Sequence, residues 1–219
     1  MENEWLNNEV RDWLREAPDR ELGKNMNLIS DKKSNESLED FLRGKNSKDV
    51  TEEYDFLAIS GIMKNKQLIG KKTGKPIDLN EKKSMFYSRP GLYIIKQQNP
   101  TDLKRWSQDR THYVGEGKNL AQRLSNRGGH RAKIFADGSE VTIIIKGTGT
   151  INQDQFFIHE VRTTCERMIS DLIEEKWPEK AACCNKPSWC VIHEAGVEQV
   201  GKLELFVRHL LKNKIISPP

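Results

Sequence analysis

The stretch Thr111–Leu124, THYVGEGKNLAQRL, joins a Tyr-Val-Gly tripeptide to a helical pattern that carries Arg123. A second tripeptide of the same kind, Gly91-Leu92-Tyr93, lies upstream. Both tripeptides fall in short runs of β-branched and aromatic residues, which are typical of strands. The polar residues between them predict a long hairpin connection. We therefore expect the two tyrosines on neighbouring strands, within a side chain's reach of each other.

The elements that follow this hairpin complete a small layered core. Leu120 and Leu124 stand at helical spacing, which predicts a helix over 118–126 that ends at Gly128-Gly129. Three further elements are predicted after it. The β-branched run at 141–146 predicts a strand, and the patterns at 153–177 and 198–214 predict helices. The order β-β-α-β-α predicts an α/β (α+β) core, with a small, mostly antiparallel three-stranded sheet flanked by helices.

The N-terminal part of the chain gives weaker signals. An amphipathic helix is predicted over 4–16, and polar residues after it predict irregular chain. Residues 54–63, YDFLAISGIM, form an apolar run whose period does not decide between helix and strand. The lysine-rich stretch after it is typical of a solvated loop, with a phosphate-contacting arm as the alternative.

The positive charge is concentrated in the segment that holds the two tyrosines. The whole chain has 36 Lys and Arg against 32 Asp and Glu, a net charge of +4. Residues 86–150 alone hold 11 Lys and Arg against 5 Asp and Glu, whereas 1–85 and 151–219 each have a net charge of −1. A basic segment of this kind favours a polyanionic partner such as nucleic acid.

The composition also indicates in which cellular compartment the protein is expected. No apolar run approaches the roughly 20 residues that span a bilayer, and the acidic, amphipathic start of the chain is unlike a signal peptide. We therefore expect a soluble protein of the cytoplasm, associated with the nucleoid, or of the nucleus if the source is a eukaryote or a virus. The four cysteines are then expected to be free thiols.

A zinc site is the alternative for three of these cysteines. Cys183, Cys184 and Cys190 stand near His193, but they lack the paired Cys-x-x-Cys spacing of most zinc sites. Buried thiols beside the end of a helix are therefore the preferred interpretation. The alternative, a zinc-dependent regulatory protein, predicts stoichiometric zinc in purified material.

Together the motifs resemble those of the GIY-YIG nuclease family. The matching residues are Gly91-Leu92-Tyr93, Tyr113-Val114-Gly115 and Lys118-Asn119-Leu120 leading to Arg123-Leu124, with an acidic residue on the later long helix. Family members typically have Tyr-Ile-Gly followed by Asn-Leu-x-x-Arg, which this chain matches with Val114 in place of isoleucine. The resemblance covers roughly residues 90–186. It implies an endonuclease that uses Mg²⁺ (or Mn²⁺) to hydrolyse DNA to 5′-phosphate and 3′-hydroxyl ends.

The side chains in these motifs suit phosphodiester hydrolysis. The reaction needs an activated water, positive charge on the non-bridging oxygens and help for the leaving oxygen; a metal held by a carboxylate supplies the last two. A phenol, with a pKa of about 10, becomes a base only where a cation lowers that value. The resemblance implies that Tyr93, or Tyr113 as the alternative, takes the proton from water. It also implies that Arg123 steadies the scissile phosphate with its fork of donors.

Glu166 is the carboxylate expected to hold the metal. At helical spacing it shares a face with Ile169, Ile173 and Trp177, and a carboxylate on such a face is costly unless it is paired or binds a metal. Glu174 falls on the polar side instead. The context ERMISDLI also resembles the Glu-x-x-Leu-Ile pattern of the family. An ion pair with a nearby arginine is the alternative role for Glu166.

The resemblance also implies residues around this centre. Family members often carry a histidine shortly after the arginine helix and an asparagine after the metal helix. The candidates here are His130 and Asn185, although Asn185 lies farther from Glu166 than is usual. Four basic residues near the motifs are expected to contact double-stranded DNA: His112, Lys118, Arg127 and Arg131.

We expect three regions in such an enzyme. They are an N-terminal extension (1–85) that serves in DNA recognition, a GIY-YIG-like catalytic core (86–186) and a C-terminal helical extension (187–219). A chain with no zinc-finger array favours a site-specific, restriction-type enzyme, and cutting two strands with one site per chain favours a homodimer. The alternatives are a mobile-element or repair endonuclease, and a module that binds DNA without cutting it.

Overall fold

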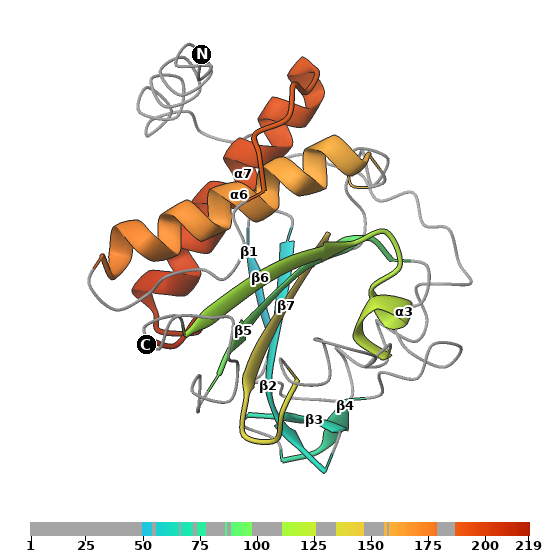
Figure 1. Cartoon of the computed structure of the whole chain (residues 1–219), viewed down its shortest axis with the longest axis vertical. Coiled ribbons are helices and arrows are strands. Elements are labelled where there is room, and N and C mark those ends of the chain that lie inside the picture. Colours follow the sequence, from blue (N-terminus) through green and yellow to red (C-terminus); the bar gives the residue numbers. More distant parts are fainter. Residues whose placement is uncertain are drawn as a thin grey trace.

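The fold is an open antiparallel sheet with two long helices against one face (Figure 1). The computed structural model describes residues 50–53, 56–65, 67–71, 74–77, 86, 89–97, 111–125, 135–146, 156, 158–178 and 187–219. The predicted α+β class is confirmed. The sheet, however, has more strands than the three that were predicted.

Seven strands make up the sheet in the described part of the chain. They are β1 (Val50–Glu53), β2 (Phe56–Lys64), β3 (Gln67–Gly70), β4 (Pro76–Ile77), β5 (Gly91–Lys96), β6 (His112–Gly117) and β7 (Glu140–Lys146). Their order is β4-β3-β2-β7-β5-β6, and β1 pairs with β2 outside this path. All pairings among them are antiparallel. The three predicted strands are β5, β6 and β7, with β5 in the middle and β6 at the edge of the sheet.

The described helices correspond to three that were predicted. They are α3 (Leu120–Ser125), α6 (His159–Lys176) and α7 (Glu194–Lys212). Figure 1 shows α6 and α7 running side by side along the sheet, with α3 apart from them. Among the described residues, no helix combines the length and the apolar character needed to cross a membrane. The helix predicted over 4–16 lies outside the described residues.

The prediction of a helical and irregular N-terminal extension is wrong for the described residues between 50 and 77. β2 is buried on both of its faces, so it lacks the alternation of apolar and polar residues that marks a half-exposed strand. The lysine-rich stretch predicted as a loop contains β3 and β4. The turns here use left-handed backbone at Asn65, with φ of 49°, and at Gly74, with φ of 65°.

The larger sheet joins regions that were expected to be separate. β2 pairs along its length with β7, from Phe56 opposite Lys146 to Ile62 opposite Glu140. Residues from 1–85 and from 86–186 therefore share one sheet. The division of the chain into three functional regions stays a prediction.

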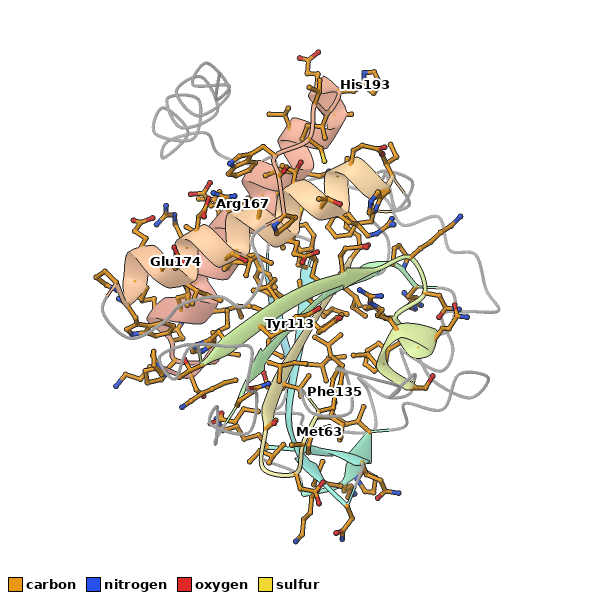
Figure 2. All side chains as sticks on the ribbon, viewed as in Figure 1. Met63, Tyr113, Phe135, Arg167, Glu174 and His193 are labelled. Carbon is orange, nitrogen blue, oxygen red and sulfur yellow. The ribbon has the colours of Figure 1, made fainter. Side chains whose placement is uncertain are left out.

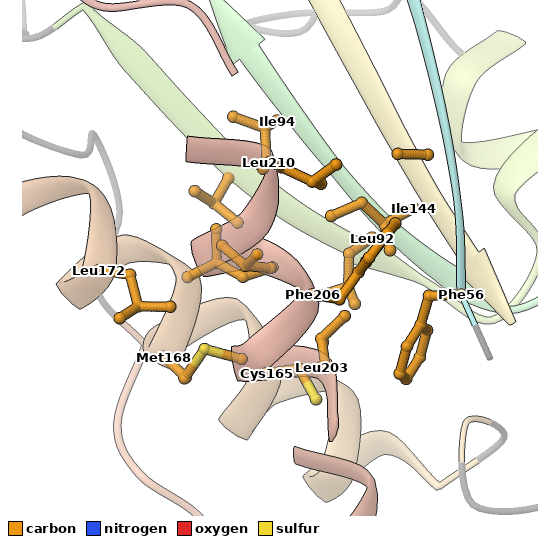
Figure 3. Close-up of a cluster of buried hydrophobic side chains, with 14 of the residues drawn as sticks. Phe56, Leu92, Ile94, Ile144, Cys165, Met168, Leu172, Leu203, Phe206 and Leu210 are labelled. Atoms are coloured by element: carbon orange, nitrogen blue, oxygen red, sulfur yellow. The ribbon is translucent and has the colours of Figure 1, made fainter. Parts of the chain in front are cut away.

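The strands contribute alternate side chains to two cores. The helix-side core joins one face of the strands to α6 and α7, and Figure 3 shows Phe56, Leu92 and Ile144 on the side of Phe206 of α7. The tyrosine-side core, on the other face, includes Tyr93 together with residues of α3. Because neighbouring residues of a strand point to opposite faces, the tyrosines lie across the sheet from the two long helices.

His112 belongs to the helix side of the sheet. Its fully buried ring stacks on Trp177, with ring centroids 5.7 Å apart. Nε2 donates a hydrogen bond of 3.0 Å to the carbonyl oxygen of Ser217, and the hydroxyl of Thr111 lies 2.8 Å from Nδ1. His112 therefore anchors the C-terminal tail. This placement does not support the predicted contact between His112 and DNA.

Acid is expected to destabilise the fold, because the buried ring of His112 would then carry a charge. Burial lowers the pKa of His112 from 6.5 to about 4; the Ser217 carbonyl and Glu140 oppose the shift, and Lys96 adds to it. Between pH 6.5 and 4 the folded protein binds fewer protons at His112 than the unfolded chain. The free energy of unfolding should therefore fall by about 3 kcal/mol as the pH decreases through this range.

The variant His112→Gln tests this expectation. Glutamine keeps an N–H donor for the Ser217 carbonyl but does not titrate. Urea unfolding between pH 4 and 7 should show a shallower dependence on pH in the variant than in the wild-type protein. Equal slopes in the two proteins would contradict the assignment.

Candidate active site

Tyr93 on β5 and Tyr113 on β6 form the centre of the candidate site. In the sheet register Tyr93 stands opposite Gly115, and Tyr113 stands opposite Ile95, so the tyrosines are diagonal neighbours on one face. Their rings stack with centroids 6.1 Å apart, and the ring of Tyr93 also packs on Phe135 at 5.9 Å. Figure 2 shows Tyr113 beside the strands and Phe135 beyond it, farther from α6.

Gly115 explains why the two tripeptides occur together. A β-carbon at this position would lie 2.8 Å from Cε2 of Tyr93, and closer still to Cζ and the hydroxyl oxygen. Glycine therefore leaves the space that the Tyr93 ring occupies. The glycine of the second tripeptide accommodates the tyrosine of the first.

Gly115→Ala is expected to displace the Tyr93 ring and destabilise the fold. Forcing an extra carbon into a packed core costs about 1–3 kcal/mol, which urea unfolding can measure. The same methyl group added to a Tyr93→Leu protein should cost much less, because leucine has no ring atoms over Gly115. A Gly115→Ala protein as stable as the wild type would show that the ring does not depend on this space.

Arg123 approaches the tyrosines from α3. Its Cβ and Cγ lie 3.1 and 3.2 Å from the place where a β-carbon of Gly117 would stand, so glycine there lets α3 come close to β6. Burial lowers the pKa of Arg123, but the phenols of Tyr93 and Tyr113 outweigh it and raise the pKa above its ordinary value. The guanidinium is therefore charged at any physiological pH.

Two buried polar atoms of this group have no hydrogen-bond partner among the described residues. They are the hydroxyl oxygen of Tyr93, whose side chain is only 1% exposed, and Nε of Arg123. The Tyr93 hydroxyl is near enough to Arg123 and Tyr113 to change their pKa values, yet its contacts lack hydrogen-bond geometry. Leaving such a group unsatisfied in a packed core costs about 1–3 kcal/mol.

Glu166 comes close to Tyr113 although α6 lies on the other face of the sheet. Burial raises the pKa of Tyr113, and the Tyr93 phenol and then the Glu166 carboxylate raise it further, while Arg123 opposes them. Both Tyr113 and Glu166 are only 8% exposed. Because β6 is the edge strand, a side chain of α6 can approach Tyr113 around this edge.

The prediction that Glu166 lies on the buried face of its helix is confirmed. Ile169 and Ile173 are fully buried in the helix-side core, and Trp177 packs against the same core. Figure 2 shows Glu174, together with Arg167, on the outer side of α6. Glu166 is the acid of this helix whose charge acts on Tyr113.

Comparison with other proteins adds no assignment. No known protein family, characterised protein or solved structure matches this chain. A function must therefore be argued from the residues themselves.

Several predicted site residues are not among the described ones. Arg127, His130, Arg131 and Asn185 lie outside the described residues, as do Cys183 and Cys184. Lys118 is described and is exposed between β6 and α3.

The described residues also bear on the zinc alternative. No group of three or more His, Cys, Asp or Glu side chains in the described ranges is placed to hold a metal ion. Cys165 and Cys190 are free thiols there. The zinc alternative stays a prediction, because Cys183 and Cys184 are not described.

An ion pair between Glu116 and Arg162 was not foreseen from the sequence. Glu116 stands in the opening motif, and Arg162 stands one helical turn before Glu166 on α6. The sequence did contain a signal for it. Arg162 lies on the buried face of a predicted helix, and a buried arginine needs an acidic partner. The identity of that partner depends on how α6 packs against β6.

Proposed function

We propose that this protein is a metal-dependent endonuclease of the GIY-YIG type, which hydrolyses phosphodiester bonds of double-stranded DNA. The observation that carries the proposal is the convergence of Tyr93, Tyr113, Arg123 and Glu166 from four different elements. A strand tyrosine or a helical arginine alone has an ordinary structural role. The hydroxyl of Tyr93 and Nε of Arg123 add weight, because neither buried atom makes a hydrogen bond among the described residues.

The donor set suits a hard divalent cation such as Mg²⁺ or Mn²⁺. The carboxylate of Glu166 is almost buried beside the phenol of Tyr113, so oxygen is the ligand atom on offer. Mg²⁺ is commonly held by one or two carboxylates together with waters and substrate phosphates. When bound, the cation would neutralise charge that develops on the phosphate and the leaving oxygen.

Tyr93 is the proposed proton acceptor for the attacking water. Its hydroxyl has no hydrogen-bond partner among the described residues, and it interacts with the charge of Arg123. Tyr113 is the weaker candidate, because burial, Tyr93 and Glu166 together raise its pKa. In its deprotonated form Tyr93 takes a proton from the water as the water oxygen bonds to phosphorus. The bond between phosphorus and the 3′ oxygen then breaks, and the leaving oxygen takes up a proton from solvent, which gives the 5′-phosphate and 3′-hydroxyl ends.

Arg123 is proposed to bind the scissile phosphate. Its guanidinium stays charged, and Nε has no acceptor in the described part of the chain. A planar fork of N–H donors matches two phosphate oxygens at once. Lys118, exposed between β6 and α3, is proposed to contact the DNA backbone nearby.

The finer proposal is a site-specific, restriction-type enzyme that acts as a homodimer. The positive charge of residues 86–150 supports a DNA partner, and one site per chain supports a dimer if both strands are cut. Such a substrate places the protein with the nucleoid in the cytoplasm, or in a nucleus. A mobile-element or repair endonuclease is the second candidate.

Cleavage of DNA by purified protein tests the proposal. Plasmid and phage DNAs are incubated with the protein and Mg²⁺ or Mn²⁺. Glu166→Ala is compared with Glu174→Ala, which removes an acid from the outer side of the same helix. We expect cutting by wild type and Glu174→Ala, and a loss of cutting in Glu166→Ala.

The products distinguish the alternatives. Discrete bands indicate a site-specific enzyme, and a smear indicates a nonspecific one. Equal cutting by Glu166→Ala would remove Glu166 from the metal role. No cutting of any DNA, RNA or branched substrate would contradict the nuclease and favour a binding module.

A further inference from the structure

A buried ion pair ties the strand that carries Tyr113 to the helix that carries Glu166. Nε of Arg162 donates to Oε2 of Glu116 over 2.6 Å, and the Arg162 side chain is 4% exposed. Nη1 of Arg162 also donates to the carbonyl oxygen of Phe156. Nδ1 of His159 lies 3.7 Å from the other carboxylate oxygen of Glu116. The first turns of α6 therefore bracket the Glu116 carboxylate.

The positions of the two partners relate this pair to the candidate site. Glu116 stands three residues after Tyr113 on β6, and Arg162 stands four residues before Glu166 on α6. Residues four apart lie on one face of a helix, separated by a rise of about 6 Å. The pair thus joins β6 to α6 about one helical turn from the place where Glu166 approaches Tyr113.

Apolar packing alone does not determine where Glu166 lies along β6. Ile169 and Ile173 bury α6 against the helix-side core, but apolar contacts have no preferred direction. A helix held only in this way can rotate or slide slightly. A hydrogen bond between a guanidinium and a carboxylate has a defined geometry, so it sets the position of α6 relative to β6.

We propose that Glu116 and Arg162 are positioning residues, which hold α6 in the register that brings the Glu166 carboxylate to the tyrosine pair. The inference rests on the proposed function, because it deepens the metal role given to Glu166. Neither residue is expected to touch the DNA or the metal. They act through Glu166, as outer partners of a metal ligand do in other proteins.

Two variants separate positioning from stability. Glu116→Asp keeps both charges but shortens the carboxylate arm. The double variant Glu116→Gln with Arg162→Met removes both charges, so no buried charge is left unpaired and the protein should fold. Asp171→Asn is the matched control, because it removes the acidic partner of Arg167 on the outer side of α6. In the wild-type protein, Nε of Arg167 lies 3.1 Å from Oδ1 of Asp171.

Binding of Mn²⁺ provides a readout that does not depend on catalysis. The chain has four tyrosines, so NMR of protein labelled with ¹³C at tyrosine Cζ gives few signals. The variants Tyr93→Phe and Tyr113→Phe identify the signals of Tyr93 and Tyr113, because each variant lacks one of them. The measurement is the Mn²⁺ concentration that half-broadens the Tyr113 signal, with Glu166→Gln as the reference for lost binding.

The expected result is a specific loss of metal affinity. Glu116→Asp and the double variant should need about 10- to 100-fold more Mn²⁺ than wild type, and Asp171→Asn should not differ from it. The thermal midpoints of the variants should not follow the same order. An unchanged Mn²⁺ requirement in both pair variants would overturn the inference.

Failure of the proposed metal role would give a different result. In that case the wild-type Tyr113 signal would not broaden with Mn²⁺. The inference would then be decided without metal, since a displaced Glu166 must change the surroundings of the Tyr113 phenol. The Tyr113 signal should shift in the double variant and in Glu166→Gln but not in Asp171→Asn, and no shift would overturn the inference.

Discussion

Tyr93→Phe is expected to lower the rate of DNA cleavage by about 100- to 10,000-fold while leaving the protein at least as stable as the wild type. The hydroxyl removed is the proposed proton acceptor. It is also buried and has no hydrogen-bond partner among the residues that the structure describes, at a cost of about 1–3 kcal/mol. A tyrosine with a purely structural role gives no reason for activity to fall while stability is kept.

Cleavage of supercoiled plasmid in single-turnover conditions measures the rate, and urea unfolding measures the stability. Tyr113→Phe is the matched control, because it removes a phenol from the neighbouring strand. We expect it to lose less activity, since burial and nearby groups keep the Tyr113 phenol protonated. A larger loss in Tyr113→Phe would exchange the roles of the two tyrosines. Full activity in Tyr93→Phe would remove Tyr93 from the reaction.

Arg123→Lys is expected to reduce the maximal cleavage rate by about 100- to 1,000-fold, which is the usual loss when one donor to a developing charge is removed. Lysine keeps the positive charge but has neither an Nε donor nor a planar fork. Nε of Arg123 is one of the buried atoms that have no hydrogen-bond partner within the described ranges. The phenols around it favour a cation, so the loss would come from geometry and not from charge.

The rate at saturating DNA and the affinity for DNA must be measured separately. Affinity is expected to change little in Arg123→Lys. Arg167→Lys is the control, because Nε of Arg167 donates to Asp171 on the outer side of α6 and lies away from the tyrosines. Weaker DNA binding with an unchanged maximal rate in Arg123→Lys would make Arg123 a general backbone contact, contrary to the proposed role.

Local patterns were sufficient for the elements around the tyrosines. The β-branched run at 141–146 and the Tyr-Val-Gly tripeptide lie in strands, and Leu120 and Leu124 lie in a helix. The buried face of α6 followed from helical spacing, which placed Glu166 with Ile169 and Ile173. Each of these features depends on residues close together in the chain. The same kind of reasoning failed for β2, because burial on both faces removes the alternation by which a strand is recognised.

Contacts between distant residues required the folded chain. The sequence could not indicate that β6 is the edge strand, and only this position lets Glu166 approach Tyr113 from the other face of the sheet. It could not pair Glu116 with Arg162, nor place His112 under the carbonyl of Ser217, which lies 105 residues away.

By itself, then, the sequence determined which residues are candidates for chemistry and which local element carries each one. The spacing of residues within one helix or strand is enough to identify the candidates and to assign each of them to an element. Only the tertiary structure decided which of them meet, because the order of strands and the packing of α6 on the sheet bring together residues far apart in the chain. The unpartnered atoms of Tyr93 and Arg123 belong to this second class, since a lack of partners is defined only in the packed core.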